Sequence, residues 1–455
     1  MKRFVIFVLP ILALMVAACA TPTSAPTHTP APNQVAPSAP TVAPTASATA
    51  TLTPEATRTP TPTPSATPEA KPIKIGVLSD QTGTLALYAP LIENGFALGL
   101  DFATDGKNNV AGRALQVIVK DTASKPEIGV QVARDLIEKE NVDVLIGVPS
   151  AGVALAIADL AKQYRKIYIA QPTFVNDLSA KNFNPYVFRT SRTSVQDLSA
   201  SGIAFRMMGR SLIHVASENQ MGIAQAAAYY AMVKTHGGYF VMNDNSDRRG
   251  AILIPQEAKD FTPLLQKVVE SGADGVIVTW AGAGFVPLFT QMQQVGIFKT
   301  MKVFTNFGDN QTIKAGYGSV IGATGIIPYH YTLPKNSVND WLALKSKEKF
   351  STPPDVYVES SFTAAQMLVS ALKATNGNAN ADVLIPVLEK LSFDGPKGKY
   401  TVRDYDHVLL QPLYYVKLKN NDDPDFKFFD LIYELKPEET APPCFLEGEY
   451  KSRCR

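Results

Sequence analysis

From residue 73 onward, short apolar segments alternate with longer amphipathic ones, and this alternation constrains the fold more than any other feature. The short segments, such as Ile73–Leu78 and Val142–Ile146, are rich in β-branched residues and are typical of buried strands. The segments between them carry apolar residues three and four positions apart, which is typical of helices. Because strands that alternate with helices form parallel sheets covered on both faces, the sequence predicts an α/β fold.

The alternation begins again after residue 190 and continues to about residue 304, which predicts two Rossmann-like lobes with parallel sheets. The later helical segments lack intervening strands, so we expect them to pack back on the first lobe. The segments Tyr400–Val402, Leu413–Val416 and Phe428–Tyr433 are expected to be antiparallel strands that complete the second lobe.

The first 19 residues have the composition of a targeting signal. They begin with Lys2 and Arg3, continue through an apolar stretch and end in Val16-Ala17-Ala18-Cys19, which resembles a bacterial lipoprotein signal peptide. The resemblance implies that Cys19 becomes the new N-terminus and carries acyl chains, which anchor the protein stably when two or more are present. An ordinary secretion signal that happens to precede a cysteine is the alternative.

Residues 20–70 hold 12 of the 33 prolines and no Phe, Trp or Tyr. Such a segment cannot bury enough apolar surface to offset the entropy of ordering it. We therefore predict a disordered, Pro/Thr-rich tether, which is also a candidate for O-glycosylation. The rest of the chain is expected to lie outside the membrane.

Charge and the scarcity of metal-ligating residues exclude several classes of function. The 43 Lys and Arg against 41 Asp and Glu leave a net charge of +2, which gives no basis for binding nucleic acid. The 5 His and 3 Cys are scattered without zinc spacing, so no metal and no cofactor are expected. Cys444 and Cys454 are expected to form a disulfide in an oxidising compartment, two free thiols being the alternative.

Several short motifs follow one another in a fixed order between residues 73 and 433. They are Ile75-Gly76-Val77, Thr82-Gly83 with Tyr88, Asn94–Leu98, Val110–Arg113, Asp121-Thr122, Ile146-Gly147, Phe188–Thr190 with Gln196, and Asp260–Leu265. In this order and spacing the chain resembles the type I periplasmic binding proteins of the branched-chain amino acid class, the extracellular receptors of ABC importers. The resemblance implies two α/β lobes joined by three chain crossings, with the ligand between them.

The implied crossings fall near Thr190, Gly325 and Asp406. The predicted domains are therefore a signal peptide (1–19), a tether (20–70), a first lobe (71–190 with 326–405) and a second lobe (191–325 with 406–455).

Ligands of open parallel sheets bind beyond the carboxyl ends of the strands, where loops meet the N-termini of helices. Carried over to this sequence, the resemblance implies a ligand held by residues of both lobes. These are Tyr88, Ser150, Ala151, Gly152, Thr173 and Phe174 in the first lobe, and Gln220, Trp280 and Asn306 in the second.

The nature of the ligand depends on charge. An α-amino acid needs an acidic partner for its ammonium group, because burying an unpaired charge costs several kcal/mol. Asn306 occupies the family's acidic position, and the family's serine-rich turn is reduced to Ser150-Ala151-Gly152. Asp309 is an alternative ammonium partner if its loop turns inward. An amide or an aromatic acid is therefore as well supported as an amino acid.

Together these features predict a lipid-anchored solute-binding protein that faces the periplasm or exterior and has no enzymatic activity. It would capture an amino acid or a related amide or aromatic ligand by hinge closure and deliver it to an ABC permease. A sensor or regulatory lipoprotein that contacts a membrane partner is the alternative. A hydrolase is disfavoured because the sequence has no Gly-x-Ser-x-Gly motif, and His214 and His330 have no evident Ser and Asp partners.

Overall fold

The computed structural model describes residues 71–83, 85–242, 250–255, 258–280 and 284–454. The predicted signal peptide with its lipidation residue Cys19, and the predicted tether over residues 20–70, lie outside the described residues. Within the described ranges, no helix is both long enough and apolar enough to cross a membrane.

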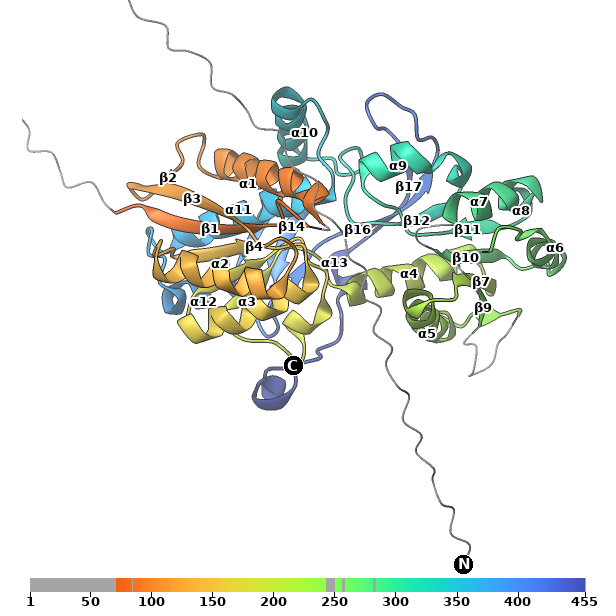
Figure 1. Ribbon diagram of the computed structural model, residues 1–455, viewed down its shortest axis with the longest axis horizontal. Coiled ribbons are helices and arrows are strands. Elements are labelled where there is room, and N and C mark those ends of the chain that lie inside the picture. The colour runs from red at the N-terminus through yellow and green to blue at the C-terminus, as the bar shows by residue number, and fades with distance from the viewer. Residues whose placement is uncertain (1–70, 84, 243–249, 256–257, 281–283, 455) are drawn as a thin grey trace, which may run out of the picture. The chain divides into compact units, whose positions relative to one another are not determined.

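The first sheet has six strands among the described residues, in the order β2-β3-β1-β4-β5-β6 (Figure 1). All neighbours are parallel except β2, which forms a short antiparallel hairpin with β3. The strands are β1 (Ile73–Ser79), β2 (Asn109–Val110), β3 (Arg113–Asp121), β4 (Val144–Gly147), β5 (Ile167–Ala170) and β6 (Val187–Arg189). The inner strands β4 and β5 are buried along their whole length, which explains their uninterrupted apolar sequences.

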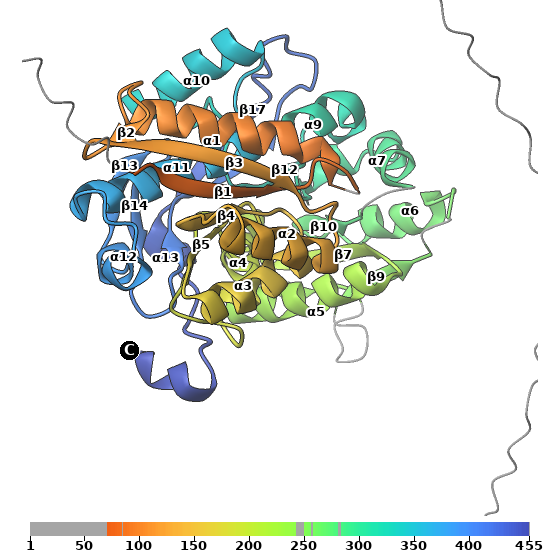
Figure 2. The same ribbon diagram turned by 60° about the vertical axis from the view of Figure 1, so that its left-hand side comes forward.

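Helices cover both faces of this sheet (Figures 1 and 2). One apolar core joins the sheet to α1 and α11, and the other joins it to α2 and α3. The helices are α1 (Ala89–Ala103), α2 (Pro126–Glu138), α3 (Ala151–Tyr164), α10 (Ser337–Phe350), α11 (Val356–Ala374) and α12 (Ala381–Leu388). The later helices pack back on the first lobe as expected, α11 and α12 against the sheet and α10 against α1 and α11.

Two glycines allow α1 and α11 to approach closely. A Cβ atom added to Gly95 would lie 2.3 Å from the carbonyl oxygen of Val358, and one added to Gly99 would lie 2.5 Å from that of Phe362. The Gly95 and Gly99 positions are four residues apart and therefore lie on one face of α1. A helix distant in the sequence can thus rest directly against the backbone of α1.

The second sheet has eight strands within the described ranges, in the order β17-β16-β12-β11-β10-β7-β8, with β9 also paired to β7. The strands β7 to β12 are parallel where they pair, and β16 and β17 extend the sheet in antiparallel fashion. They are β7 (Ser211–Ser217), β8 (Tyr239–Phe240), β9 (Ala251–Ile254), β10 (Gly275–Thr279), β11 (Lys302–Phe304), β12 (Thr324–Ile327), β16 (Leu413–Leu418) and β17 (Phe429–Leu435).

The second sheet also has helices on both faces, with α4 and α5 on one side and α6 to α9 on the other. Their bounds are α4 (Ser194–Met208), α5 (Gln220–Thr235), α6 (Thr262–Glu270), α7 (Phe285–Gln294), α8 (Ile297–Thr300) and α9 (Asn310–Gly316). We call the six-stranded sheet with α1–α3 and α10–α12 the first lobe, and the eight-stranded sheet with α4–α9 the second lobe. The predicted α/β fold with parallel sheets is confirmed.

One strand prediction was wrong. Tyr400–Val402 belongs to β14 (Gly398–Val402), which pairs with β13 (Ser392–Gly395) and β15 (Leu409–Leu410) in a separate three-stranded sheet. Tyr400, Val402 and Leu409 are buried in the core of the first lobe. The alternation of apolar residues indicates which side of β14 is buried, but it does not indicate against which lobe that side packs.

The chain passes between the two lobes where β6 leads to α4, where β12 leads to α10 and where β15 leads to β16. In the described part of the chain, β12 remains in the second sheet to Ile327 and β15 remains in the three-stranded sheet to Leu410. The boundaries at 190/191, 325/326 and 405/406 stay predictions.

A buried polar network connects these three crossings. The Nζ atom of Lys397 donates to the side-chain oxygen of Gln411, donates to the carbonyl oxygen of Pro328 at 3.2 Å, and lies 3.8 Å from the carboxylate of Glu359. The side-chain nitrogen of Gln411 in turn donates to the carbonyl oxygen of Thr190 at 3.0 Å. One lysine and one glutamine therefore touch all three connections between the lobes.

The C-terminal segment makes a further connection. After β17, α13 (Pro437–Thr440) packs against α4 of the second lobe. A disulfide between Cys444 and Cys454, whose Cα atoms are 5.7 Å apart, then closes a loop that rests on the first lobe. Arg453 donates to the carboxylate of Glu389 at 2.6 Å, and the Tyr450 ring lies 5.1 Å from that of Phe183. We call residues 436–454 the C-terminal strap.

Candidate functional site

The carboxyl end of β4 leads into α3 at the predicted serine turn. Ser150 is the N-cap of α3, and its hydroxyl accepts a 3.5 Å hydrogen bond from the backbone N–H of Val153. Ala151 and Gly152 form the exposed first turn, and their backbone N–H groups have no hydrogen-bond partner among the described residues. The start of α3 therefore offers free donors and the positive end of a helix dipole to a ligand oxygen.

Tyr88 lies at the start of α1 and forms an aromatic pair that the sequence did not reveal. Its ring centroid is 4.2 Å from that of Tyr357, with the planes inclined by 30°, and both side chains are half-buried. Burial, together with the neighbouring Tyr88, raises the pKa of Tyr357 above its usual range. Tyr357 lies 269 positions after Tyr88, so no local motif connects the two residues.

The loop after β5 carries Thr173 and Phe174, and the two face different surroundings. Thr173 is 1% exposed, and its backbone oxygen accepts a hydrogen bond from Arg189 at 2.9 Å. Phe174 is half-buried, and the guanidinium carbon of Arg192 lies 4.0 Å from its ring centroid. Phe174 thus contacts a charged residue of the first crossing, whereas the buried Thr173 helps to hold the loop through its backbone hydrogen bond with Arg189.

In the second lobe, Asn306 follows β11 and is exposed. Tyr229 of α5 donates from its hydroxyl to the Asn306 side-chain oxygen at 3.5 Å. Both residues line a cavity of about 260 Å³ together with Arg192, Ser194, Gln225 and Phe307. The cavity lies where the first crossing meets the carboxyl end of the second sheet, and neither Arg192 nor Tyr229 was predicted.

Among the other second-lobe positions, Trp280 and Asp309 are engaged with neighbouring residues. Trp280 follows β10 but is only 6% exposed, because its indole packs edge-on against Phe261 at 5.6 Å within the second core. Gln220 is the first residue of α5, and its side chain is outside the description. Asp309 caps α9, accepting from the backbone N–H groups of Gln311 and Thr312 at 3.0 Å each. That the nine predicted residues contact a ligand stays a prediction.

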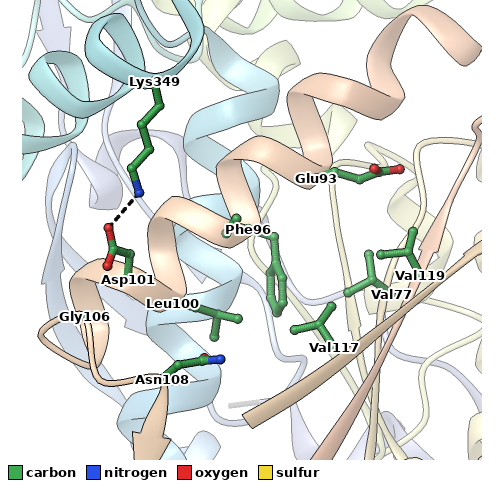
Figure 3. A pocket seen from close by; sticks show the side chains of 11 residues that line it. Val77, Glu93, Phe96, Leu100, Asp101, Gly106, Asn108, Val117, Val119 and Lys349 are labelled. Carbon is green, nitrogen blue, oxygen red and sulfur yellow. Dashed lines mark hydrogen bonds and ion pairs between the residues drawn. The ribbon is translucent and has the colours of Figure 1, made fainter. Parts of the chain in front are cut away.

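A second cavity of about 400 Å³ lies between α1 and the strands β1 and β3 of the first sheet (Figure 3). Its wall is apolar and includes Phe96, Leu100 and Val117, and its rim carries an ion pair of 3.0 Å between Asp101 and Lys349. This cavity is on the face of the sheet rather than at the carboxyl ends of the strands. It is therefore separate from the predicted ligand site.

The arrangement resembles known solute-binding proteins in both sequence and structure. The Leu/Ile/Val-binding protein homolog 6 of Brucella abortus (strain 2308) is 22% identical over 365 residues, which cover 77% of this chain and 88% of the relative. The crystal structure of an ABC-type branched-chain amino acid transporter from Rhodopseudomonas palustris CGA009 is 29% identical, with a TM-score of 0.72 and coverage of 83% of this chain and 100% of that one.

A third similar protein is the solute binding protein of an ABC transporter from Rhodopseudomonas palustris BisB5, solved in complex with 3,4-dihydroxybenzoic acid. It is 23% identical, with a TM-score of 0.64 and coverage of 80% of this chain and 97% of that one, and it supports the fold. Residues 72–423 match the periplasmic binding protein family. By this match and by its fold, the chain belongs to the periplasmic binding protein family and is a substrate-binding protein of the ABC-transporter class rather than an enzyme.

Proposed function

We propose that this protein is a lipid-anchored receptor of an ABC importer, which encloses a small solute between its two lobes and delivers it to a membrane permease. The solute is an amino acid or a related amide or aromatic ligand. The proposal is supported by the free helix donors at Ala151 and Gly152, by the Tyr88–Tyr357 pair at the start of α1, and above all by the cavity that Arg192 of the first crossing lines together with Asn306. Such a site needs only closure of the lobes and no covalent chemistry.

A thermal-shift screen of the mature protein tests solute binding. A compound at one hundred times its dissociation constant stabilises the folded state by roughly 2.7 kcal/mol. Because similar proteins are named for branched-chain amino acids and for an aromatic acid, the panel contains both classes and their amides. If no member of the panel raises the melting temperature, the proposal is contradicted.

Two substitutions test the proposed site in the first lobe. Tyr88→Ala removes a ring of the aromatic pair, and Ser150→Ala removes the hydroxyl at the start of α3, so each is expected to weaken the solute that the screen identifies. Tyr239→Ala is a matched control, because Tyr239 is 49% exposed on an outer strand of the second sheet. Unchanged affinity in both test variants would place the solute elsewhere.

Anchoring and closure have separate tests. Cys19→Ser is expected to move the protein from the membrane fraction to the soluble fraction, because the lipidated residue is lost. Small-angle scattering is expected to show a decrease in the radius of gyration when the identified solute is added. An unchanged scattering profile at saturation would contradict closure.

A further inference from the structure

Arg192 lies on the first crossing, between β6 and α4, and lines the cavity that contains Asn306 and Tyr229. Its side chain is only 13% exposed. A guanidinium group that is so far withdrawn from water needs partners for its five N–H bonds. The identity of those partners indicates what the cavity is built to receive.

Two residues hold the guanidinium group in place. The ring of Phe174, from the first lobe, lies 4.0 Å from the guanidinium carbon and gives a cation–π contact. The carboxylate of Asp197, from the second lobe, accepts a hydrogen bond from Nε at 2.8 Å. The two terminal nitrogens, Nη1 and Nη2, donate to no other residue in the described part of the chain. An oriented arginine with a free terminal edge matches the two oxygens of a carboxylate.

The local charge also favours an anion. Arg189 is 1% exposed and directs its N–H groups at backbone carbonyl oxygens, so no carboxylate neutralises it directly. Burial, and next the charge of Arg192, lower the pKa of Arg189 to about 10. Asp406 and, less strongly, Asp197 oppose this lowering, but neither carboxylate is hydrogen-bonded to Arg189. Arg189 and Arg192 therefore place two guanidinium groups close together at the first crossing, which favours an anion over a cation there.

The same surroundings offer little to an ammonium group. Asn306, at the carboxyl end of β11, is neutral. Asp309 is engaged as the cap of α9, and Asp197 is engaged by Arg192. An ammonium group buried here would lack a dedicated partner, which costs several kcal/mol.

We infer that Arg192 determines ligand specificity by holding a carboxylate through its two terminal nitrogens, and that the solute is an aliphatic or aromatic monocarboxylic acid that needs no α-ammonium group. The inference rests on the proposed solute-binding function and assigns a ligand class to the same site. Asp197 is a positioning residue, which orients the guanidinium group without touching the ligand.

Calorimetric titration with matched probes tests the inference. The probes are benzoate against benzamide and 4-methylpentanoate against 4-methylpentanamide, with leucine as the ammonium-bearing relative of the aliphatic acid. The wild-type protein is expected to bind at least one acid roughly ten- to hundredfold more tightly than its amide, because a charge-assisted hydrogen-bonded pair is lost. Leucine is expected to bind more weakly than 4-methylpentanoate, because its ammonium group would lack a partner.

Variants of the arginine separate recognition from support of the fold. Arg192→Gln is expected to bring the ratio of acid to amide affinity close to one, and Arg192→Lys, which keeps the charge but not the planar fork, is expected to give an intermediate ratio. Asp197→Asn is expected to weaken acid binding while keeping the preference for the acid. Arg165→Gln is the matched control, because Arg165 is exposed and pairs with Asp382 at 2.6 Å. Circular dichroism spectra establish whether each variant is folded, and Arg192→Lys serves if Arg192→Gln does not fold.

The outcomes distinguish this inference from the function on which it rests. If the wild-type protein binds amides or leucine as tightly as the acids, or if the arginine variants keep the wild-type ratio, the carboxylate assignment is wrong but solute binding stands. If no acid, amide or amino acid binds, the proposed function fails and the assignment fails with it. An acid preference that disappears in Arg192→Gln supports both.

Discussion

Replacing Lys397 by methionine tests the network that joins the three crossings. The side chain of Lys397 is fully buried and that of Glu359 is 3% exposed, so neither charge is solvated by water. Lys397→Met leaves the Glu359 carboxylate buried with hydrogen bonds from Thr363 and Tyr400 but without a counter-charge. The substitution also removes the donors to Gln411 and Pro328, which belong to two different crossings.

The expected effect follows from the geometry. For two charges 3.8 Å apart, an effective dielectric constant of about 20 gives an attraction of about 4 kcal/mol. Burial opposes this attraction and lowers the pKa of Lys397 to about 8, so the lysine is still mainly charged at pH 7. Removing one partner of a buried pair typically costs about 3–5 kcal/mol, because the other charge stays buried. We expect Lys397→Met to lower the free energy of unfolding by about this amount.

Urea unfolding followed by circular dichroism at pH 7 measures the effect. The double variant Glu359→Gln/Lys397→Met removes the stranded charge as well, so it is expected to be more stable than Lys397→Met by at least about 1 kcal/mol. The control is Lys139→Met, which breaks an exposed pair with Asp135 and is expected to cost less than about 1 kcal/mol. The reasoning is refuted if Lys397→Met costs no more than this control.

Three further predictions concern other parts of the molecule. Gly95→Ala is expected to destabilise the protein by about 1–3 kcal/mol in urea unfolding, because the new Cβ would meet Val358; the control Gly316→Ala has open space and is expected to be neutral or stabilising. Burial raises the pKa of Asp355 to about 6, with a smaller effect from Asp309. Between about pH 4 and 6 the folded chain therefore holds a proton that the unfolded chain has lost. As the pH rises through this range, the free energy of unfolding of the wild type should fall by about 3 kcal/mol relative to that of Asp355→Asn. Parallel pH profiles of the two unfolding free energies would contradict this. Replacing both Cys444 and Cys454 by serine is expected to destabilise the loop that they close by about 3 kcal/mol, because the open loop gains conformational entropy when it unfolds. Limited proteolysis should then cleave the C-terminal strap faster than in the wild type, and equal cleavage rates would contradict this.

The sequence predicted the parts of the fold that depend on local periodicity. The alternation from Ile73 onward indicated parallel sheets and two lobes, and apolar strands such as β4 are buried as their composition required. It did not assign β14 to the correct core, because the face of a strand is encoded locally and its packing partner is not.

In the candidate site too, local sequence indicated some residues, whereas contacts between distant segments determine others. Ser150 and Asn306 lie at the carboxyl ends of strands, where a predicted parallel sheet places its ligand loops. Tyr357 and Arg192, which belong to the proposed site, were not predicted, because no spacing rule relates them to Tyr88 and Phe174, which they contact. Trp280 illustrates the reverse case, since an aromatic residue at a suitable position in the sequence is covered by Phe261.

If the two lobes turn apart as the proposed function requires, the C-terminal strap limits their separation. The strap begins at the end of β17 in the second lobe and is fixed to the first lobe by the contact of Arg453 with Glu389. The length of the strap between these two points is therefore the largest distance by which they can separate. The eight residues 436–443 span at most roughly 28 Å when fully extended, and α13 shortens that reach because a helix rises less per residue. A receptor with such a limit loses less entropy when its lobes come together, because its widest conformations are already excluded.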